Sequence, residues 1–224
     1  QTPKRGGNIR VCTYTSSTSD TLDPAKQSNA SDYVRCNFFY NKLVRIDEAG
    51  APAPELAESF DSQDAKTWVF KLRKGVTFHD GKALTTEDVI YSLKRHLDPA
   101  VGSKANTLAK QMTSIEASSP NEVTIVLSGA NADWPTILGT AHFHIVQAGT
   151  TDFSKGIGTG PFTCKEFIPG VRTIALRNAN YWRQPGPFVD SIEFFGLPDE
   201  QARLNALMSG DVQIAAVINR ARCG

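Results

Sequence analysis

The sequence predicts an α/β protein, and three patterns support this fold class. Apolar and polar residues alternate over residues 9–13 and again over 67–72, as is typical of strands with one buried face. A capping box from Thr85 to Asp88 opens a helix that continues through Leu93. Near the end, a strand (191–195), a helix (199–208) and a strand (212–217) form a βαβ unit, whose two strands should be parallel.

Capping and turn residues predict the elements between these. Ser31 is expected to cap a helix whose apolar positions include Val34, Phe38 and Leu43. Asp80-Gly81 predicts a turn, and strands at 115–117 and 123–127 around the turn residues 118–121 predict a hairpin. Gly210 suits the left-handed position that ends the 199–208 helix.

Composition limits the classes of function. The 224 residues carry 24 Lys and Arg against 23 Asp and Glu, a net charge of +1. Without a basic excess to neutralise phosphates, nucleic acid is not an expected partner. No apolar run approaches the roughly 20 residues of a membrane-spanning helix. The chain begins at Gln1, so we expect a secreted protein whose signal peptide has been removed.

Four cysteines, Cys12, Cys36, Cys164 and Cys223, lie far apart, and no pair has the C-x-x-C spacing of a zinc or redox site. One or two disulfides are possible in an oxidising compartment. Free buried thiols explain the same residues at least as well.

Two glycine-rich stretches resemble nucleotide-binding motifs, but neither has the residues that such a motif requires at each position. The stretch 75–82 has five residues between its glycines instead of four, and Ala83 follows where Ser or Thr should bind magnesium. In KGIGTGPF (155–162), Pro161 stands where a dinucleotide-binding helix should open. Neither stretch predicts a phosphate cradle, so a sharp turn or domain connection is the better interpretation of KGIGTGPF.

His142 and His144 stand two residues apart, so in a strand they would share one face. This pair keeps a metal-dependent hydrolase open as an alternative, although a stable site usually needs three or four ligands. A polar strand edge accounts for the pair equally well. Ser17 and Thr18 lack an evident partner base, so we expect no enzymatic activity and no cofactor.

A resemblance carries the interpretation further. The stretch ELAESFDSQDAKTWVFKLRKGVTFHDGKALTTEDVIYSLKR (55–95) resembles the signature region of the family 5 extracellular solute-binding proteins of ABC importers. Four further segments are similar to the family in the same order: TLDP (21–24), GTGPF (158–162), RNANYW (177–182) and ARLNALMSGDVQIA (202–215). These five segments extend from the first to the last part of the chain.

The resemblance implies a fold of the periplasmic binding-protein type (type II, family 5). Residues 1–43 and 158–224 would form most of a discontinuous first lobe, and residues 44–157 an inserted α+β subdomain. Family members are roughly twice as long, so the second lobe is expected to be absent from this chain. The GTGPF glycines would supply the backbone torsions of the return into lobe one.

The resemblance also implies a function, the substrate-binding component of an ABC importer. It would capture a peptide, opine or metal chelate in the periplasm and deliver it to a membrane permease. A truncated module with a non-transport role is a further alternative, and exposed strand edges make self-association possible. Carried over by position, the expected ligand-binding residues are Tyr14, Ser17, Thr18, Gln27, Asp32, Ser103, Asn106, His142 and His144.

Overall fold

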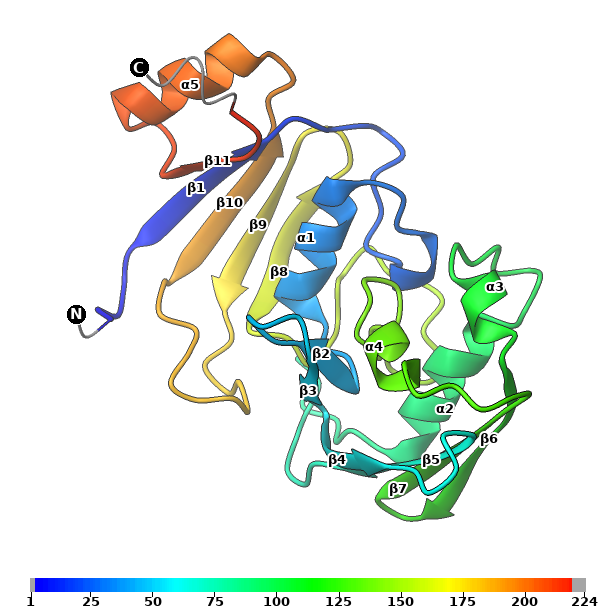
Figure 1. The fold of residues 1–224 in the computed structure, drawn as a ribbon. Helices are drawn as coiled ribbons and strands as arrows, with labels where there is room; N and C mark the ends of the chain where they lie inside the picture. Colours follow the sequence, from blue (N-terminus) through cyan, green and yellow to red (C-terminus); the bar gives the residue numbers. More distant parts are fainter. Residues whose placement is uncertain (1–2, 219–224) are drawn as a thin grey trace.

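Two sheets organise the computed structural model, which describes residues 3–218 (Figure 1). The larger sheet has five strands in the order β11-β1-β10-β9-β8, with β1 parallel to both of its neighbours and the remaining pairs antiparallel. Its strands are β1 (Asn8–Thr13), β8 (Phe162–Ile168), β9 (Arg172–Arg177), β10 (Ser191–Gly196) and β11 (Ile214–Ala215). The predicted α/β fold is therefore confirmed.

The second sheet is antiparallel, in the order β4-β5-β7-β6, and a two-stranded ribbon of β2 and β3 lies beside it (Figure 1). These strands are β2 (Val44–Ile46), β3 (Pro52–Pro54), β4 (Ala57–Asp61), β5 (Thr67–Leu72), β6 (Met112–Ser119) and β7 (Glu122–Leu127). The helices are η1 (Pro24–Lys26), α1 (Ala30–Phe39), α2 (Thr86–Arg95), α3 (Asn106–Ala109), α4 (Trp134–Leu138) and α5 (Glu200–Ser209). Within residues 3–218 no helix is both long enough and apolar enough to cross a bilayer.

Each sheet has its own hydrophobic cluster. In the first, Cys36 and Phe39 of α1 pack with Phe162, Ile192 and Phe194 of the five-stranded sheet. The second fills the space between the four-stranded sheet, α2 and α4 with side chains such as Phe70, Val89, Leu93, Ile125 and Trp134. Alternate strand residues face these clusters, which is why the period-2 patterns predicted β5 and β7 correctly.

Several local expectations are confirmed. The capping box of Thr85 and Asp88 opens α2, and the β6–β7 hairpin turns at Pro120 and Asn121. Gly210 closes α5 in the left-handed conformation at φ +80°. The strands of the final βαβ unit are parallel as expected, but β1 lies between them and β11 has two residues rather than six.

The predicted cap of α1 is wrong. Asn29 is the N-cap, and its Oδ1 accepts a 3.0 Å hydrogen bond from the Asp32 amide. Ser31 instead lies inside the first turn and donates its hydroxyl to the Thr15 carbonyl oxygen at 3.0 Å. The helix ends at Phe39, so Leu43 lies outside it.

The prediction that His142 and His144 lie in a strand is also wrong. Residues 141–146 form a turn and an extended segment, in which His144 makes one isolated bridge to Lys42. The two imidazoles therefore do not share a strand face.

The cysteines within the described residues are free thiols: Cys12 and Cys36 are buried, and Cys164 is half-buried. Burial raises the pKa of Cys164 to about 11, which keeps this thiol protonated and unreactive at neutral pH. Cys223 lies outside the described residues.

The GTGPF glycines serve close packing rather than unusual torsions. A Cβ at Gly158 would lie 2.1 Å from the Phe39 carbonyl oxygen, and one at Gly160 would lie 2.4 Å from the Phe39 carbonyl carbon. Neither glycine has a positive φ. The Gly160 amide donates to the Phe39 carbonyl at 2.9 Å, and His79 bonds both glycines. This segment thus packs directly against the end of α1.

Candidate functional site

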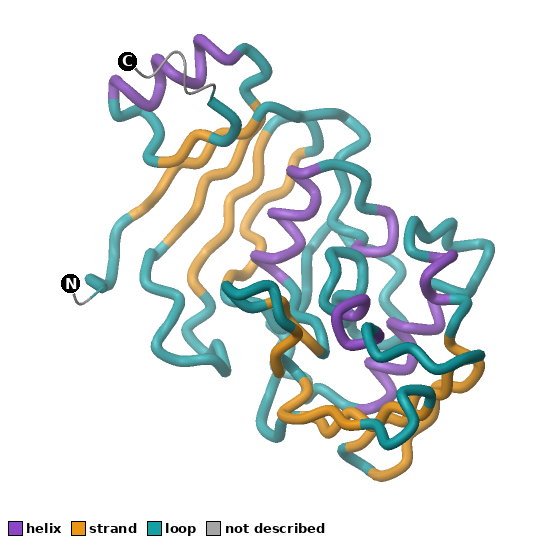
Figure 2. Tube along the Cα trace, in the orientation of Figure 1, coloured by secondary structure: helices purple, strands orange, loops and turns teal. Residues whose placement is uncertain are grey.

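The carboxyl ends of three parallel strands, β11, β1 and β10, lie at one edge of the five-stranded sheet, and α1 begins near the same edge (Figures 1 and 2). In open α/β sheets, ligands bind in the crevice outside this edge. The segment that leaves β1, residues 14–19, crosses the edge on its way to η1 and α1. We call residues 14–19 the edge loop.

Two glycines hold the edge loop by close contact. A Cβ at Gly196, the last residue of β10, would lie 2.1 Å from Ser16 Cβ and 2.7 Å from the Thr15 carbonyl oxygen. Gly170, in the turn between β8 and β9, lies against the backbone of Ser17 and Thr18, where a Cβ would come within 3.1 Å. The loop backbone is therefore fixed from both sides.

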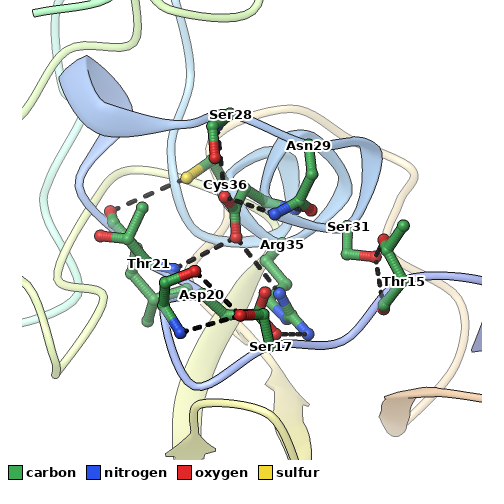
Figure 3. Close-up of polar contacts among 12 residues, drawn as sticks. Thr15, Ser17, Asp20, Thr21, Ser28, Asn29, Ser31, Arg35 and Cys36 are labelled. Atoms are coloured by element: carbon green, nitrogen blue, oxygen red, sulfur yellow. Dashed lines mark hydrogen bonds and ion pairs between the residues drawn. The ribbon is translucent and has the colours of Figure 1, made fainter.

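Hydroxyl groups bond the edge loop to itself and to α1 (Figure 3). The Ser17 and Ser19 hydroxyls are 2.9 Å apart, and the Asp20 amide donates to the Ser17 carbonyl at 3.0 Å. The hydroxyls of Thr15 and Ser31 are also hydrogen-bonded to each other. These short polar side chains need little rotamer ordering to present hydroxyls to solvent at this edge.

A buried ionic cluster stands behind the loop (Figure 3). The Arg35 guanidinium lies 2.9 Å from Asp20 Oδ2 and 3.3 Å from Asp32 Oδ1, with all three side chains almost completely buried. The same guanidinium lies over the rings of Phe194 (5.2 Å) and Phe167 (5.8 Å). One cation thus ties the loop, α1 and the sheet together.

Asp32 organises the following turn of the chain. Its carboxylate accepts hydrogen bonds from the amides of Thr21 (3.1 Å) and Ser28 (3.3 Å) and from Asn29 Nδ2 (3.0 Å). Burial raises the pKa of Asp32, while the bonds from the backbone amides oppose that rise. The role of Asp32 in this structure is to hold residues 20–29 in place.

Asp23 joins residues 20–29 to α2, the helix that packs on the four-stranded sheet. Its two carboxylate oxygens accept from Arg95 of α2 at 3.1 and 2.8 Å, a paired geometry typical of strong Arg–carboxylate contacts. Arg95 also stacks on Phe153 at 4.4 Å.

The nine expected ligand-binding residues fall into separate groups. Tyr14, Ser17 and Thr18 lie together, exposed, on the edge loop. Asp32 is buried beneath them in the ionic cluster.

A second group joins the end of η1 to the 141–146 segment. Gln27 Nε2 donates to the Ala141 carbonyl at 3.0 Å and lies 3.5 Å from His144 Nδ1, while the His142 ring bonds the Gln27 carbonyl at 3.1 Å. Gln27 and His144 are buried, and burial lowers the pKa of His144 well below its usual value. His144 Nε2 is 3.2 Å from Asn37 Oδ1. This group fills a junction between segments rather than an open cleft.

The third group, Ser103 and Asn106, forms hydrogen bonds with His96. Ser103 Oγ is 2.7 Å from His96 Nδ1, and Asn106 Nδ2 donates to the His96 carbonyl at 2.8 Å. Both residues also line a surface hollow of about 430 Å³ at the loop before α3. They lie on different elements from the edge loop.

Comparison with known proteins gives the family. Residues 51–222 match the model of the bacterial extracellular solute-binding proteins, family 5. This chain belongs to that family. It is 32% identical over 203 residues to the glutathione-binding protein GsiB of Escherichia coli K12, and 25% identical over 219 residues to the periplasmic oligopeptide-binding protein OppA of the same strain. Each alignment covers 87% of this chain, which spans about 40% of the length of these curated relatives.

Solved structures agree with the fold. The binding protein AgaA of A. tumefaciens R10, in complex with agropinic acid, superposes with a TM-score of 0.85 at 30% identity, over 92% of this chain and 43% of AgaA. DppA of Helicobacter pylori, in complex with the peptide STSA, gives a TM-score of 0.87 at 25% identity, over 98% of this chain and 48% of DppA.

No group of three or more His, Cys, Asp or Glu side chains within residues 3–218 of this family 5 chain is placed to hold a metal ion. His142 and His144 bond Gln27 and Asn37 instead. The geometry therefore gives no support to the hydrolase alternative.

Sequence reasoning missed the residues that set the loop's position. Arg35, Gly170 and Gly196 were not candidates, and neither were Thr15 and Ser16, although they lie between predicted residues. An arginine at an otherwise apolar helix position, followed by Cys36 and Phe38, was a usable signal, because a buried Arg needs anionic partners. The glycine contacts join residues far apart in sequence and leave no local pattern.

Proposed function

We propose that this chain belongs to the substrate-binding component of an ABC importer. It would capture a peptide or another small solute in the periplasm and deliver it to a membrane permease. The observation that carries the proposal is the rigid, hydroxyl-rich edge loop at the carboxyl edge of β1 and β10, in a chain of the family 5 solute-binding type. Capture of this kind makes and breaks no bond and requires no cofactor.

The domain division is part of the proposal. Residues 1–43 and 158–224 would form lobe one, and residues 44–157 would be an insertion. The separate sheets and hydrophobic clusters support this division. The contact between Gly160 and Phe39 supports a direct return of the chain to lobe one.

We assign direct solute contact to Tyr14, Ser17 and Thr18, because their side chains are exposed at the edge. Gln27, Asp32 and His144 are buried, so we assign them the task of holding the segment that carries the loop. Ser103, Asn106 and His142 would reach a solute only if it extended along the 96–106 and 141–146 segments.

Affinity arithmetic makes the proposal testable. A micromolar receptor has about 8 kcal/mol of binding free energy, so one wall that supplies half of it would bind at roughly millimolar strength. In the two-lobed receptors that this chain resembles, closure of both walls removes the solute from water.

The experiment is calorimetry of the 224-residue chain with glutathione, a tetrapeptide and an opine, followed by mass spectrometry of each solute. We expect no binding tighter than about 0.1 mM, which is about 5.5 kcal/mol, and unchanged solutes. Conversion of any solute to a product would contradict the proposed function. Tight saturable binding by this chain alone would contradict the estimate that one wall supplies half of the binding free energy.

A further inference from the structure

A cationic pocket lies at the opposite end of β10 from the edge loop. It has a volume of about 440 Å³ and is lined by Arg45, Pro54, Arg73, Trp182, Arg183 and Gln184. Residues 182–184 belong to the loop that enters the amino end of β10, whereas the edge loop packs on its carboxyl end. The six residues of β10, a strand about 20 Å long, lie between the edge loop and the loop that carries residues 182–184.

A second cavity of about 400 Å³ shares two walls, Arg73 and Trp182, with the first. It adds Lys71, Lys74 and Glu58 to the lining. The two cavities are neighbours at the β2–β3 ribbon and the end of β5, joined by these two shared lining residues, and we call them together the basic groove.

Positive charge in the basic groove is only partly balanced: one carboxylate, Glu58, faces the cations that line the two cavities, and it lies near Arg73 and Lys74 as well as Lys71. Within residues 3–218, the side chains of Arg45, Lys74 and Arg183 form no hydrogen bond or ion pair. The carboxylate of the groove, Glu58, is already paired with Lys71 at 2.9 Å. The whole chain has a net charge of +1, so this concentration of cations is a local feature.

The groove is also held in shape. Trp182 Nε1 donates to Asn41 Oδ1 at 3.1 Å, and the Arg73 guanidinium lies over the Trp182 ring at 5.2 Å. Arg73 Nε donates to the Glu55 carbonyl at 2.8 Å, which leaves its two terminal nitrogens without a hydrogen-bond acceptor in the described part of the chain. A fixed guanidinium with free donors loses little entropy when it binds an anion.

We propose that the basic groove binds a phosphate group. Guanidinium forks match phosphate oxygens in a bidentate geometry, and each such charge-assisted hydrogen bond is roughly twice as strong as a neutral one. Arg45, Arg73 and Arg183 supply these forks, and Lys74 adds a point charge. The group comes either from a free phosphate compound or from a phospholipid headgroup. This site is independent of the solute site at the edge loop.

The test titrates the chain with inorganic phosphate at low ionic strength and follows the indole N–H resonance of Trp182. A parallel arm measures co-sedimentation with phosphatidylglycerol vesicles against phosphatidylcholine vesicles. The variant R45Q/R183Q removes two unpaired cations, and K110Q/K165Q removes two exposed lysines outside the groove as a matched control.

We expect saturable binding in at least one arm, with affinity at least tenfold lower in R45Q/R183Q and unchanged in K110Q/K165Q. Phosphate binding assigns a free compound, and binding to the anionic vesicles alone assigns the headgroup. Absence of binding in both arms, or an equal loss in both double variants, would overturn the proposal. The Trp182 resonance of the unaltered chain gives a readout that does not depend on folding of the variants.

Discussion

Gly196 and Ser16 are in direct contact across the carboxyl edge of the sheet, because the edge loop lies on the last residue of β10 with no room for a side chain between them. The contact joins residues 180 positions apart in the sequence. It sets the distance between the edge loop and the end of β10. It therefore also sets the position of the hydroxyls that we assign to solute contact.

Replacing Gly196 with Ala should displace the edge loop. The new methyl group would lie 2.1 Å from Ser16 Cβ, so the backbone must move, and overpacking of this kind costs about 1–3 kcal/mol of unfolding free energy. Urea unfolding of G196A against G129A measures this cost. Gly129 has open space around its Cβ position and a normal φ, so its variant should stay within about 0.5 kcal/mol of the parent. Equal stability of the two variants would rule out the tight contact.

Arg203 of α5 should be essential for the β11 end of the sheet. Its buried guanidinium donates to the carbonyls of Leu197 (2.7 Å), Pro198 (2.8 Å), Ala216 (3.1 Å) and Val217 (2.9 Å). R203M leaves these carbonyls without their donor and should cost at least about 2 kcal/mol. Hydrogen exchange should accelerate first at residues 214–217, while β5 and β7 stay protected. Uniform acceleration over both sheets would contradict a local role, and K165M serves as the surface control.

Stability should fall in mild acid because of buried histidines. Burial, helped by the charges of Arg95 and His142, lowers the pKa of His96 from 6.5 to about 4. Between these pH values His96 is protonated in the unfolded chain but neutral in the folded chain. The free energy of unfolding therefore decreases as pH falls from 6.5 towards 4. One such group contributes a slope of up to about 1.4 kcal/mol per pH unit.

The variant H96Q isolates this contribution, since the other titrating groups are common to both proteins. Urea unfolding at pH 4.5, 5.5 and 7 should show a shallower decline for H96Q than for the parent. Parallel declines would mean that His96 carries a proton in the folded protein.

Self-association is expected through the α5–β11 surface. Met208 (78%), Val217 (65%) and Ile214 (51%) are strongly exposed, and among the described strands β11 pairs with β1 alone. An apolar surface beside an unpaired strand edge favours pairing with a second chain. Sedimentation velocity should show mass increasing with concentration, and M208K/I214K should suppress this increase where V171K does not. A monomer at every concentration would count against it.

The sequence predicted correctly those helices and strands in which apolar residues recur with the period of the element and cap residues stand at its ends. β5, β7 and α2 belong to this class, because alternation and capping are encoded within ten residues. The β8–β9 hairpin was not predicted. In β9 the buried positions are Thr173 and Ala175, while the larger apolar residues Ile174 and Leu176 lie on the less buried face, so hydropathy does not follow burial there. Most residues of β8 are half-buried. An isolated bridge from His144 to Lys42 stands where a strand was expected, because its partner belongs to the segment that follows α1 and not to a neighbouring hairpin.

The sequence predicted where the candidate site lies along the chain, but not which of its polar side chains are exposed. Position after the first strand marked Tyr14, Ser17 and Thr18, and these side chains are exposed at the edge. Gln27 and His144 were expected to contact a ligand because of the positions that they share with the family, and the structure places both of them, buried, at a junction between segments. Burial of a polar side chain depends on contacts 114 to 117 residues away, which a single sequence does not display.

Mapping of amide chemical shifts tests the central claim most directly. Glutathione, a tetrapeptide and an opine are each titrated to about tenfold above the millimolar affinity expected of one wall. The account predicts that at least one solute shifts the amides of Tyr14, Ser17 and Thr18 together with those at the ends of β10 and β11. Shifts confined to other surfaces, or an edge loop that responds to none of these solutes, would contradict it.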